Sequence, residues 1–494
     1  MSRVLVSIGA LQAFLILVNL GRSKALSVLL GPSGLGVVST IDQLVLTVVH
    51  LGTLSLPFTA LKFMAKGHSE APERFSHSFA GFLRALTVLT VLAAVVASVL
   101  LALWPAVYGE DLLRYRSVLH LAFISVPALA LNVLFVNTLA AAQRPAAAAG
   151  LSLSVAAVLC VAAIAGAAIG GVRGIYVATS ATGLVTTAVS LVFLRRGLNL
   201  ATASPSGIVG ELRRTPEILP YAIFFYLVMS AYSLTMLAAR YFVFSGLGEA
   251  TAGLLQALFS ISLSITAVLG PMSNLYLTPL VNRSMPEAEK VKATNEFAAT
   301  LVALLLLASV PFVLFPKLAL SILFTSAFSP AAPALYLFVL WQCLYQIANV
   351  YQQLLIGLDD VRFVSVAALL GFGTSALLMP LLIPRFELAG AALALAIGML
   401  LYGMAAALRL RARFGVGVPR ALWLRAGVAI GALMLTGAFF AGGEELTVSG
   451  ALARLVAGLV IAAILWIQLT PNERNSIRSL LPGKSATTWG PGRP

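Results

Sequence analysis

Two arginines lie inside long apolar stretches of this sequence, where an uncompensated charge costs several kcal/mol. Arg22 precedes Gly31 by about nine residues, and Arg240 precedes Gly248 by about eight. At 1.5 Å per residue, each guanidinium should lie roughly 12–13 Å from the end of its helix. Because arginine holds phosphate with two parallel hydrogen bonds, the pair could bind an anion in one cavity. Alternatively, each arginine extends to the membrane interface or pairs with a carboxylate.

Three further charged or titratable residues lie close to Arg22 in the sequence. Lys24 is about 200° from Arg22 around the helix and points elsewhere, but it is a second basic candidate for a substrate site. Asp42 is the only acid inside any expected membrane span, and it could pair with Arg22 or Lys24, or bind a coupling proton or cation. His50, two turns beyond Asp42, is either a core histidine bonded to a carbonyl or part of a proton relay.

A stripe of amides runs along the expected helix 332–357. Its members recur at the i, i+4, i+7 and i+11 positions of one helix face: Gln342, Gln346, Asn349 and Gln353. Such a stripe either holds helices together or lines a wet cavity that could bind sugar hydroxyls. We therefore count Gln346, Asn349 and the neighbouring Tyr345 as candidate substrate-binding residues.

Motifs for covalent chemistry are missing from the sequence. It contains no complete P-loop, no HExxH, no CxxC pair and no G-x-S-x-G, which are the signatures of nucleotide, zinc, redox and acyl-transfer sites. Cys160 and Cys343 lie in apolar runs and are expected to be small core residues. We predict that the protein is not an enzyme and has neither a cofactor nor a metal site.

The composition is that of an integral membrane protein. Of the 494 residues, 60% are hydrophobic and only 10% are charged, with a mean hydropathy of +0.99. A soluble surface needs far more charge. The net charge of +15 does not indicate a nucleic-acid partner, because the basic residues are spread over short loops on alternate sides of the helices.

Apolar stretches long enough to span a bilayer predict an all-α protein with about 14 transmembrane helices. They lie near 5–30, 36–60, 79–104, 117–141, 148–170, 174–194, 220–244, 252–281, 297–316, 332–357, 363–383, 388–410, 420–441 and 449–470. With the N-terminus in the cytoplasm, cytoplasmic segments receive about 22 of the 32 Lys and Arg, as the positive-inside rule requires. Both termini are therefore expected in the cytoplasm. Arg84 and Arg454, near span ends, should extend to the interface.

An internal repeat organises these spans into two lobes. Leu30-Gly31 matches Leu247-Gly248, and Gly36 matches Gly253. Repeated sets of membrane helices usually surround a central site. The expected parts are a first lobe of six helices (1–200), a cytoplasmic linker (201–219), a second lobe of six helices (220–412), an appended helix pair (413–472) and a cytoplasmic tail (473–494).

The turn Leu-Gly-Pro-Ser-Gly-Leu-Gly at 30–36, the Ala-Lys-Gly at 65–67 and the repeat of the turn at 247–253 resemble Wzx-type polysaccharide flippases. These belong to the superfamily that also holds the MATE antiporters and the lipid II flippases. The resemblance implies a V-shaped pair of lobes and alternating access to a cationic cavity. By position, Arg22 matches a first-helix arginine that the lipid II flippases use. Many Wzx proteins have 12 spans, however, and this chain lacks the first-span acid of many cation-coupled antiporters.

The expected function is therefore export of a lipid-linked glycan. The resemblance implies that the cargo is an undecaprenyl-pyrophosphate-linked oligosaccharide, moved across the bacterial inner membrane for surface polysaccharide assembly. Arg22, Arg240 and Lys24 would bind the pyrophosphate, and coupling to H+ or Na+ is expected to involve Asp42 or His50. A polysaccharide polymerase and membrane lipids are the expected partners. The alternatives are a lipid II flippase, a MATE-like multidrug antiporter and, in another class, a membrane enzyme of glycan assembly.

Overall fold

The protein is described from a computed structural model, which covers residues 2–70, 72–198, 200, 218–267, 286–415, 417–440 and 447–468. Within these ranges the chain is all helical, as expected. The predicted linker 201–219, apart from its last two residues, the tail 473–494 and the end of the predicted span 252–281 lie outside the described residues.

The first lobe contains the helices before the predicted linker. They are α1 (Ser2–Thr53), α2 (Leu56–Glu70), α3 (Pro72–Leu103), η1 (Pro105–Tyr108), α4 (Glu110–Leu113), α5 (Arg116–Phe123), α6 (Val126–Ala141) and α7 (Pro145–Gly197). The second lobe and the appended pair follow. They consist of α9 (Ile218–Leu247), α10 (Glu249–Ala267), α12 (Glu287–Leu314), α13 (Pro316–Leu323), η2 (Ser326–Ala331), α14 (Ala332–Gly357), α15 (Val361–Phe414), α16 (Arg420–Phe440) and α17 (Val448–Gln468).

Eight helices of the described residues are long and apolar enough to cross a membrane. Three of them, α1, α7 and α15, are pairs of expected spans joined across a kink, at Gly31, at Gly170–Gly171 and at Glu387. The sequence predicted short loops at these places, whereas the chain reverses over one or two residues. Shorter apolar stretches lie in α2, α10, α16 and α17.

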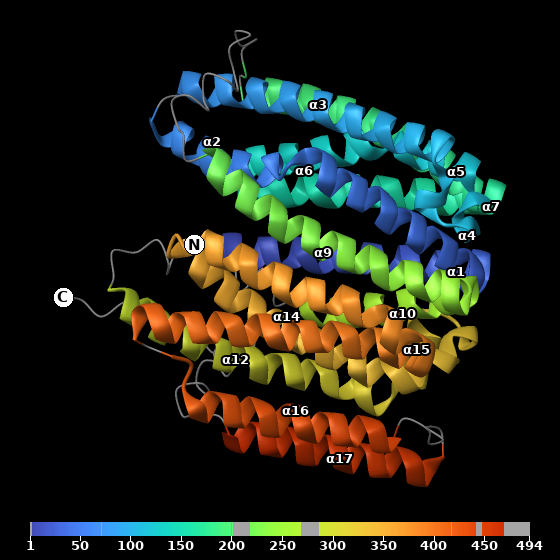
Figure 1. The fold of residues 1–494 in the computed structure, drawn as a ribbon, viewed down its shortest axis with the longest axis vertical. Coiled ribbons are helices and arrows are strands. Elements are labelled where there is room, and N and C mark those ends of the chain that lie inside the picture. The colour runs from blue at the N-terminus through green and yellow to red at the C-terminus, as the bar shows by residue number, and fades with distance from the viewer. Residues whose placement is uncertain are drawn as a thin grey trace.

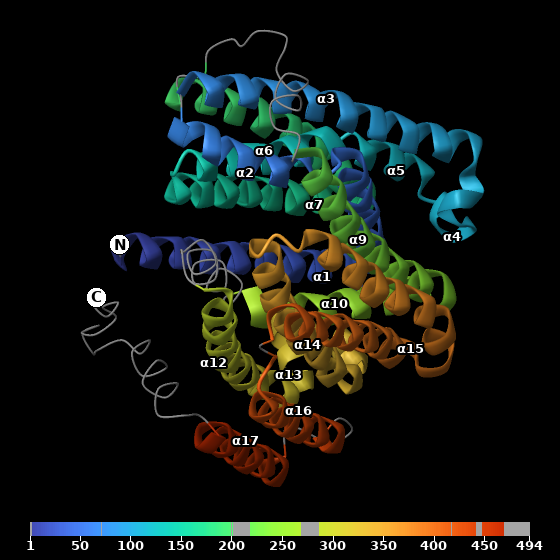
Figure 2. The same ribbon diagram turned by 60° about the vertical axis from the view of Figure 1, so that its left-hand side comes forward.

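The two lobes lie side by side and are joined through α1 and α9, which pass close to each other in the middle of the molecule (Figures 1 and 2). Helices α2, α3, α6 and α7 form the far side of the first lobe. Helices α12, α14 and α15 belong to the second lobe, and α16 and α17 cover the outer face of that lobe. This arrangement puts the helices that follow the two repeated turns at the seam between the lobes.

The internal repeat is visible in the backbone as well as in the sequence. Six of the ten described residues with a positive φ form three pairs separated by nearly the same number of residues. The pairs are Gly31 (φ 65°) with Gly248 (90°), Gln143 (56°) with Asp359 (56°), and Gly171 (56°) with Glu387 (50°). Each pair ends a helix at matching points of the repeat.

The repeated turns themselves pack against each other across the seam. A Cβ on Gly36 would overlap the carbonyl oxygen of Glu249, and a Cβ on Gly253 would overlap that of Pro32. Only glycine permits backbones to approach this closely. The two equivalent glycines therefore hold the lobes together at this end of the molecule.

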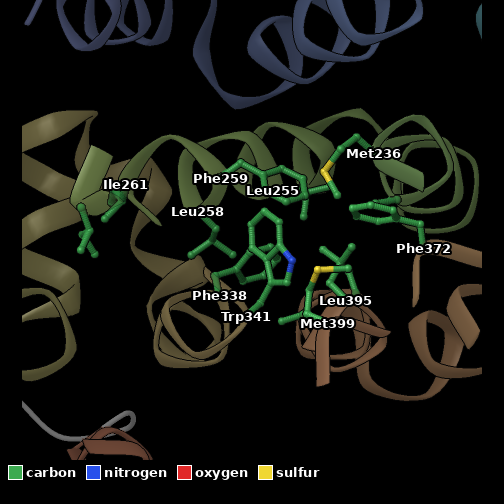
Figure 3. Packing of buried hydrophobic residues seen from close by; sticks show 14 of the residues in the cluster. Met236, Leu255, Leu258, Phe259, Ile261, Phe338, Trp341, Phe372, Leu395 and Met399 are labelled. Carbon is green, nitrogen blue, oxygen red and sulfur yellow. The ribbon is translucent and has the colours of Figure 1, made fainter. Parts of the chain in front are cut away.

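The core of the second lobe is aromatic. Phe259 of α10 meets Phe338 and Trp341 of α14 edge to face, with ring centroids 5.3 Å apart in both cases, and all three are buried (Figure 3). Edge-to-face pairs add to the packing energy of the buried area.

Arg454 of α17, expected to extend to the membrane interface, is buried against protein, at 1% exposure. Its guanidinium donates to the carbonyl oxygens of Leu314 and Phe440, at the ends of α12 and α16, and lies over the Phe440 ring. The last carbonyls of a helix lack intrahelical donors, so Arg454 satisfies two helix ends and fastens the appended pair to the second lobe.

Candidate functional site

A cavity of about 270 Å³ lies inside the first lobe. Its walls come from both halves of α1, from the start of α6 and from both halves of α7. The polar and charged lining residues are Asn19, Arg22, Asp42, Ser125, Asn132, Tyr176 and Thr179, with Cys160 beside them. A cavity that gathers charged and amide side chains among expected membrane spans is a candidate binding site, because such side chains are costly there unless they serve a partner or a ligand.

Arg22 and Asp42 form the centre of this cavity. Arg22 Nη2 donates to Asp42 Oδ2 at 3.0 Å, and both side chains are about one-third exposed, 32% and 33%. The kink at Gly31 explains the meeting, because it turns the second half of α1 back along the first. Residues nearly equidistant from the kink then lie at similar depth. The sequence left Arg22 and Lys24 open as partners of Asp42, and in the structure the partner is Arg22.

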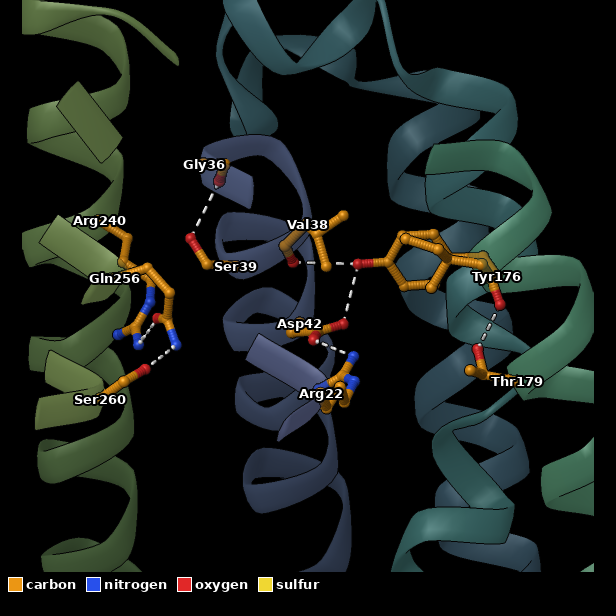
Figure 4. Close-up of polar contacts among 11 residues, drawn as sticks. Arg22, Gly36, Val38, Ser39, Asp42, Tyr176, Thr179, Arg240, Gln256 and Ser260 are labelled. Atoms are coloured by element: carbon orange, nitrogen blue, oxygen red, sulfur yellow. Dashed lines mark hydrogen bonds and ion pairs between the residues drawn. The ribbon is translucent and has the colours of Figure 1, made fainter. Parts of the chain in front are cut away.

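Tyr176 of α7 completes the cluster and was missed by sequence reasoning. Its hydroxyl lies 2.8 Å from Asp42 Oδ1 and 3.0 Å from the carbonyl oxygen of Val38, as Figure 4 shows. The side chain is buried, at 3% exposure. Its signal in the sequence was weak: a single tyrosine in an apolar run, two residues after the glycine that opens the second half of α7.

The arrangement leaves part of Arg22 available to a ligand. The described contacts of its guanidinium comprise one hydrogen bond, from Nη2, and the side chain lines the cavity. Nε and Nη1 can therefore donate to an anion that enters. Asn132 of α6 also lines the cavity: its Nδ2 donates to Thr187 Oγ1 at 3.2 Å, and its Oδ1, which is closed off from solvent, has no partner among the described residues.

Arg240 does not line this cavity. It is 8% exposed, donates to Gln256 Oε1 at 2.9 Å and lies over the ring of Phe259, 4.6 Å from its centroid. The expectation that both arginines face one cavity is not met in this conformation. The reason is register: Arg22 precedes its kink by nine residues and Arg240 by eight, and one residue turns a side chain by about 100° around a helix.

Figure 4 shows the separation of the two clusters: Arg240 with Gln256 on one side of the second half of α1, and Arg22 with Asp42 and Tyr176 on the other. That both arginines bind one anion together stays a prediction, and it would require a conformation in which the lobes are arranged differently.

Lys24 and His50 also lie outside the cavity lining. Lys24 Nζ donates to the carbonyl oxygens of Ser321, at 3.3 Å, and Phe324, at the end of α13. In this conformation it therefore links the lobes. His50 lies in the last turn of α1, and its buried Nδ1 has no hydrogen-bond partner among the described residues, so the expected carbonyl bond is not made by that atom.

The amide stripe of α14 lies within the second lobe. Gln342 and Gln346 are buried, whereas Asn349 is half-buried. Tyr345 packs between Tyr232 and Trp341, with centroid distances of 5.8 and 6.3 Å. None of these residues lines the Arg22 cavity, and their role in binding sugars stays a prediction.

No protein-family model matches this chain, and no curated protein matches it either. Solved structures do. The lipid II flippase MurJ, in an inward closed conformation, superposes with a TM-score of 0.71 at 12% identity, over 96% of this chain and 100% of that one.

MATE transporters are similar over a smaller part of the chain. MATE in complex with MaL6 gives a TM-score of 0.59 at 15% identity, over 87% of this chain and 96% of the other. An outward-facing multidrug resistance MATE transporter of the MOP superfamily gives 0.58 at 16% identity, over 87% and 96%. At such identities the likeness concerns the fold: the chain has the architecture of a multi-pass membrane flippase or transporter.

Proposed function

We propose that this protein flips a prenyl-pyrophosphate-linked oligosaccharide across the bacterial inner membrane by alternating access between its lobes, for the assembly of a surface polysaccharide. The observation that carries the proposal is the polar cavity centred on Arg22, inside a fold that matches a lipid II flippase over nearly its whole length. The cargo would need a cationic group at membrane depth for its head and an open route to lipid for its tail.

Arg22 suits the pyrophosphate. A guanidinium presents several donors in a fixed fork and stays protonated, and in a low-dielectric cavity its attraction for an anion is much stronger than in water. Asn19, an exposed amide that lines the cavity, supplies hydrogen bonds for sugar hydroxyls. Arg240 and the amide stripe of α14 would join the site only if the lobes rearrange during transport.

The extent of the fold also favours a lipid-linked cargo. The match to the flippase includes 96% of this chain, whereas the MATE structures cover 87%. The appended pair α16–α17 is fastened by a buried arginine, so it is a built part of the protein. A lipid II precursor is the alternative cargo of the same chemistry.

A multidrug antiporter is the second candidate function, and Asp42 is the observation that favours it, because a carboxylate in a membrane cavity can hold a cation or a proton. Against it, the only carboxylate among the lining residues of this cavity is already paired with Arg22. A membrane enzyme of glycan assembly has no supporting cluster in the cavity. Both termini are placed in the cytoplasm on the charge bias of the loops, and a polysaccharide polymerase is the expected partner.

The proposal is tested by export in a strain that lacks its own flippase. Arg22→Ala should reduce surface polysaccharide at least tenfold while the protein still reaches the membrane, because the cavity no longer offsets the desolvation of pyrophosphate. Arg22→Lys should keep part of the activity, since it retains the charge but not the fork. Arg385→Ala is the matched control, because Arg385 is exposed at a helix turn and should be silent.

Normal export by Arg22→Ala at normal membrane levels would remove Arg22 from the site. Resistance to cationic drugs, conferred by the wild-type protein without any effect on polysaccharide, would favour the antiporter instead.

A further inference from the structure

The hydroxyl of Tyr176 lies between two acceptors. It is 2.8 Å from Asp42 Oδ1 and 3.0 Å from the carbonyl oxygen of Val38. A phenol has one hydrogen to donate and lone pairs with which to accept, so it can serve only one of the two acceptors fully at a time. When Asp42 is ionised, the hydroxyl donates to its carboxylate, and the Val38 carbonyl remains as an alternative acceptor.

In this geometry both protonation states of Asp42 find hydrogen-bond partners, and only the hydroxyl hydrogen of Tyr176 has to turn. As a carboxylate, Asp42 accepts from Tyr176 through Oδ1 and from Arg22 through Oδ2. As a carboxylic acid, it can donate from Oδ1 to the Tyr176 oxygen, while the Tyr176 hydroxyl turns to the Val38 carbonyl. The same three groups thus support an ionised and a neutral side chain.

An anion on Arg22 would change which state is stable. Asp42 and a diphosphate compete for the same guanidinium, and the diphosphate carries more charge. When Nε and Nη1 of Arg22 donate to the ligand, Asp42 keeps its bond to Nη2 but shares its counter-ion with a second anion that lies beside it. A carboxylate next to another negative charge binds a proton more readily.

The charged and titratable groups around Asp42 do not offer another partner. Arg22 lies on the first half of α1, Tyr176 and Cys160 lie on α7, and the lining part of α6 contributes only neutral side chains. Arg240, on α9, is close enough to act on Asp42 electrostatically, but it is hydrogen-bonded to Gln256 of α10. Among the lining residues of the cavity, Asp42 is the only carboxylate.

We propose that Asp42 takes up one proton when an anionic diphosphate head group binds Arg22, so that cargo binding and protonation are linked in the first-lobe cavity; this inference rests on the function proposed above. One proton passes from water to Asp42 Oδ1 for each head group bound, and Tyr176 holds the resulting acid. Because linkage is reciprocal, a higher pH must weaken the binding of the head group.

The test measures the protons exchanged when a short prenyl diphosphate, farnesyl diphosphate, binds to the purified full-length protein in lipid nanodiscs. Calorimetric titration in two buffers with different ionisation enthalpies yields the number of protons bound per ligand. The wild type should take up more protons than Asp42→Asn, with a difference that approaches one. Subtracting the variant removes the diphosphate's own ionisation, which lies near pH ~6 for phosphate groups.

The affinities supply a second readout. Asp42→Asn removes the competitor for Arg22, so at high pH it should bind the diphosphate roughly tenfold more tightly than the wild type. The two affinities should converge as the pH falls and the wild type becomes protonated. Tyr176→Phe should reduce the proton uptake, because the acid form loses its acceptor. Glu249→Gln, outside the cavity, should leave the proton number unchanged.

Equal proton numbers in the wild type and Asp42→Asn would overturn the inference while leaving the anion site intact. If Asp42→Asn does not fold, unchanged proton uptake in Tyr176→Phe overturns it. If the wild type binds no diphosphate, or if Arg22→Ala binds it equally well, the proposed anion site fails and this inference fails with it.

Discussion

The two lobes share a backbone but differ in their chemistry at matching positions. Asp42 and Phe259 each follow the kink or turn of their lobe by eleven residues, counted from Gly31 and from Gly248. In the first lobe an arginine on the preceding helix bonds to the carboxylate, at 3.0 Å. In the second lobe an arginine lies over the aromatic ring, 4.6 Å from its centroid.

This difference separates a candidate binding site from a packed core. The carboxylate and Arg22 face a cavity, whereas Phe259 and Arg240 are closed in by α14 and by Gln256. The matching positions of the repeat therefore have different surroundings: Arg22 and Asp42 line a cavity, whereas Arg240 and Phe259 are buried against neighbouring side chains. The predictions below test first the shared backbone and then the differences.

The largest effect is expected where the lobes touch. Gly36→Ala and Gly253→Ala should each destabilise the purified protein by roughly 3 kcal/mol, because the added methyl meets backbone atoms that cannot rotate away. Thermal melting measures the loss. Gly246→Ala is the control, since a Cβ there meets nothing within 4 Å. A mild effect at one glycine and a severe effect at the other would break the equivalence of the two turns.

Arg454→Met should cost about 2 kcal/mol, because the two buried carbonyl oxygens that it serves lose their donor. The appended pair belongs to the second lobe alone, so the defect should be local. Limited proteolysis should release α16–α17 before the rest of the chain. Release of the whole second lobe at the same rate would contradict a separate docking of the pair.

Glu387→Gly should stabilise the protein by about 1 kcal/mol, since Glu387 adopts a backbone conformation that strains a residue with a side chain. The matching residue of the first lobe is already Gly171, with nearly the same φ. Thermal melting of Glu387→Gly and of the reverse change, Gly171→Glu, checks the prediction. Opposite signs are expected, and a loss of stability in Glu387→Gly would show that its side chain has a role of its own.

The smallest effect concerns Asp360, which follows Asp359 at the cytoplasmic end expected for α14. Burial raises the pKa of Asp360, but hydrogen bonds from Arg409 and Arg413 outweigh it and hold the pKa below its usual value. A lowered pKa stabilises the fold above the unfolded-state value of ~4, and the stabilisation is lost as the pH falls through the folded-state value.

Asp360→Asn should therefore melt below the wild type at neutral pH, and the difference should fade in acid. The first lobe has Arg144 at the matching position, bonded to the Gly197 carbonyl, so the difference caused by Arg144→Gln should not fade. A pH-independent difference for Asp360→Asn would rule out the ion pairs as its cause.

Much of the fold could be predicted from the sequence, because apolar length and the repeated turns are local signals. The kinks at Gly31 and Gly171 follow from glycine itself, whereas Glu387 could be placed only by analogy with the first lobe. Of the site, the pairing of Asp42 with Arg22 was one of the alternatives left open by depth along the helix. Depth alone, however, does not specify rotation, so the different directions of Arg22 and Arg240 were missed.

Other features depended on partners that are distant in the sequence. Tyr176 was invisible because nothing beside it in the chain signals the carboxylate that it meets. Arg454 was expected at the interface because it lies near the end of an expected span. Its two carbonyl acceptors, on α12 and α16, could not be foreseen because they meet it only once the helices have packed. Sequence position alone did not predict what these side chains contact.

The most direct test of the account compares the two arginines in proteoliposomes that contain a prenyl-pyrophosphate-linked oligosaccharide. The measured quantity is the rate at which the glycan becomes accessible on the opposite face, with the melting temperature of each variant as the folding control. The account predicts that Arg22→Ala stops flipping, while Arg240→Gln, whose amide can still bond to Gln256, keeps most of it. Normal flipping by Arg22→Ala, or an equal loss in folded Arg240→Gln, would contradict a site centred in the first lobe.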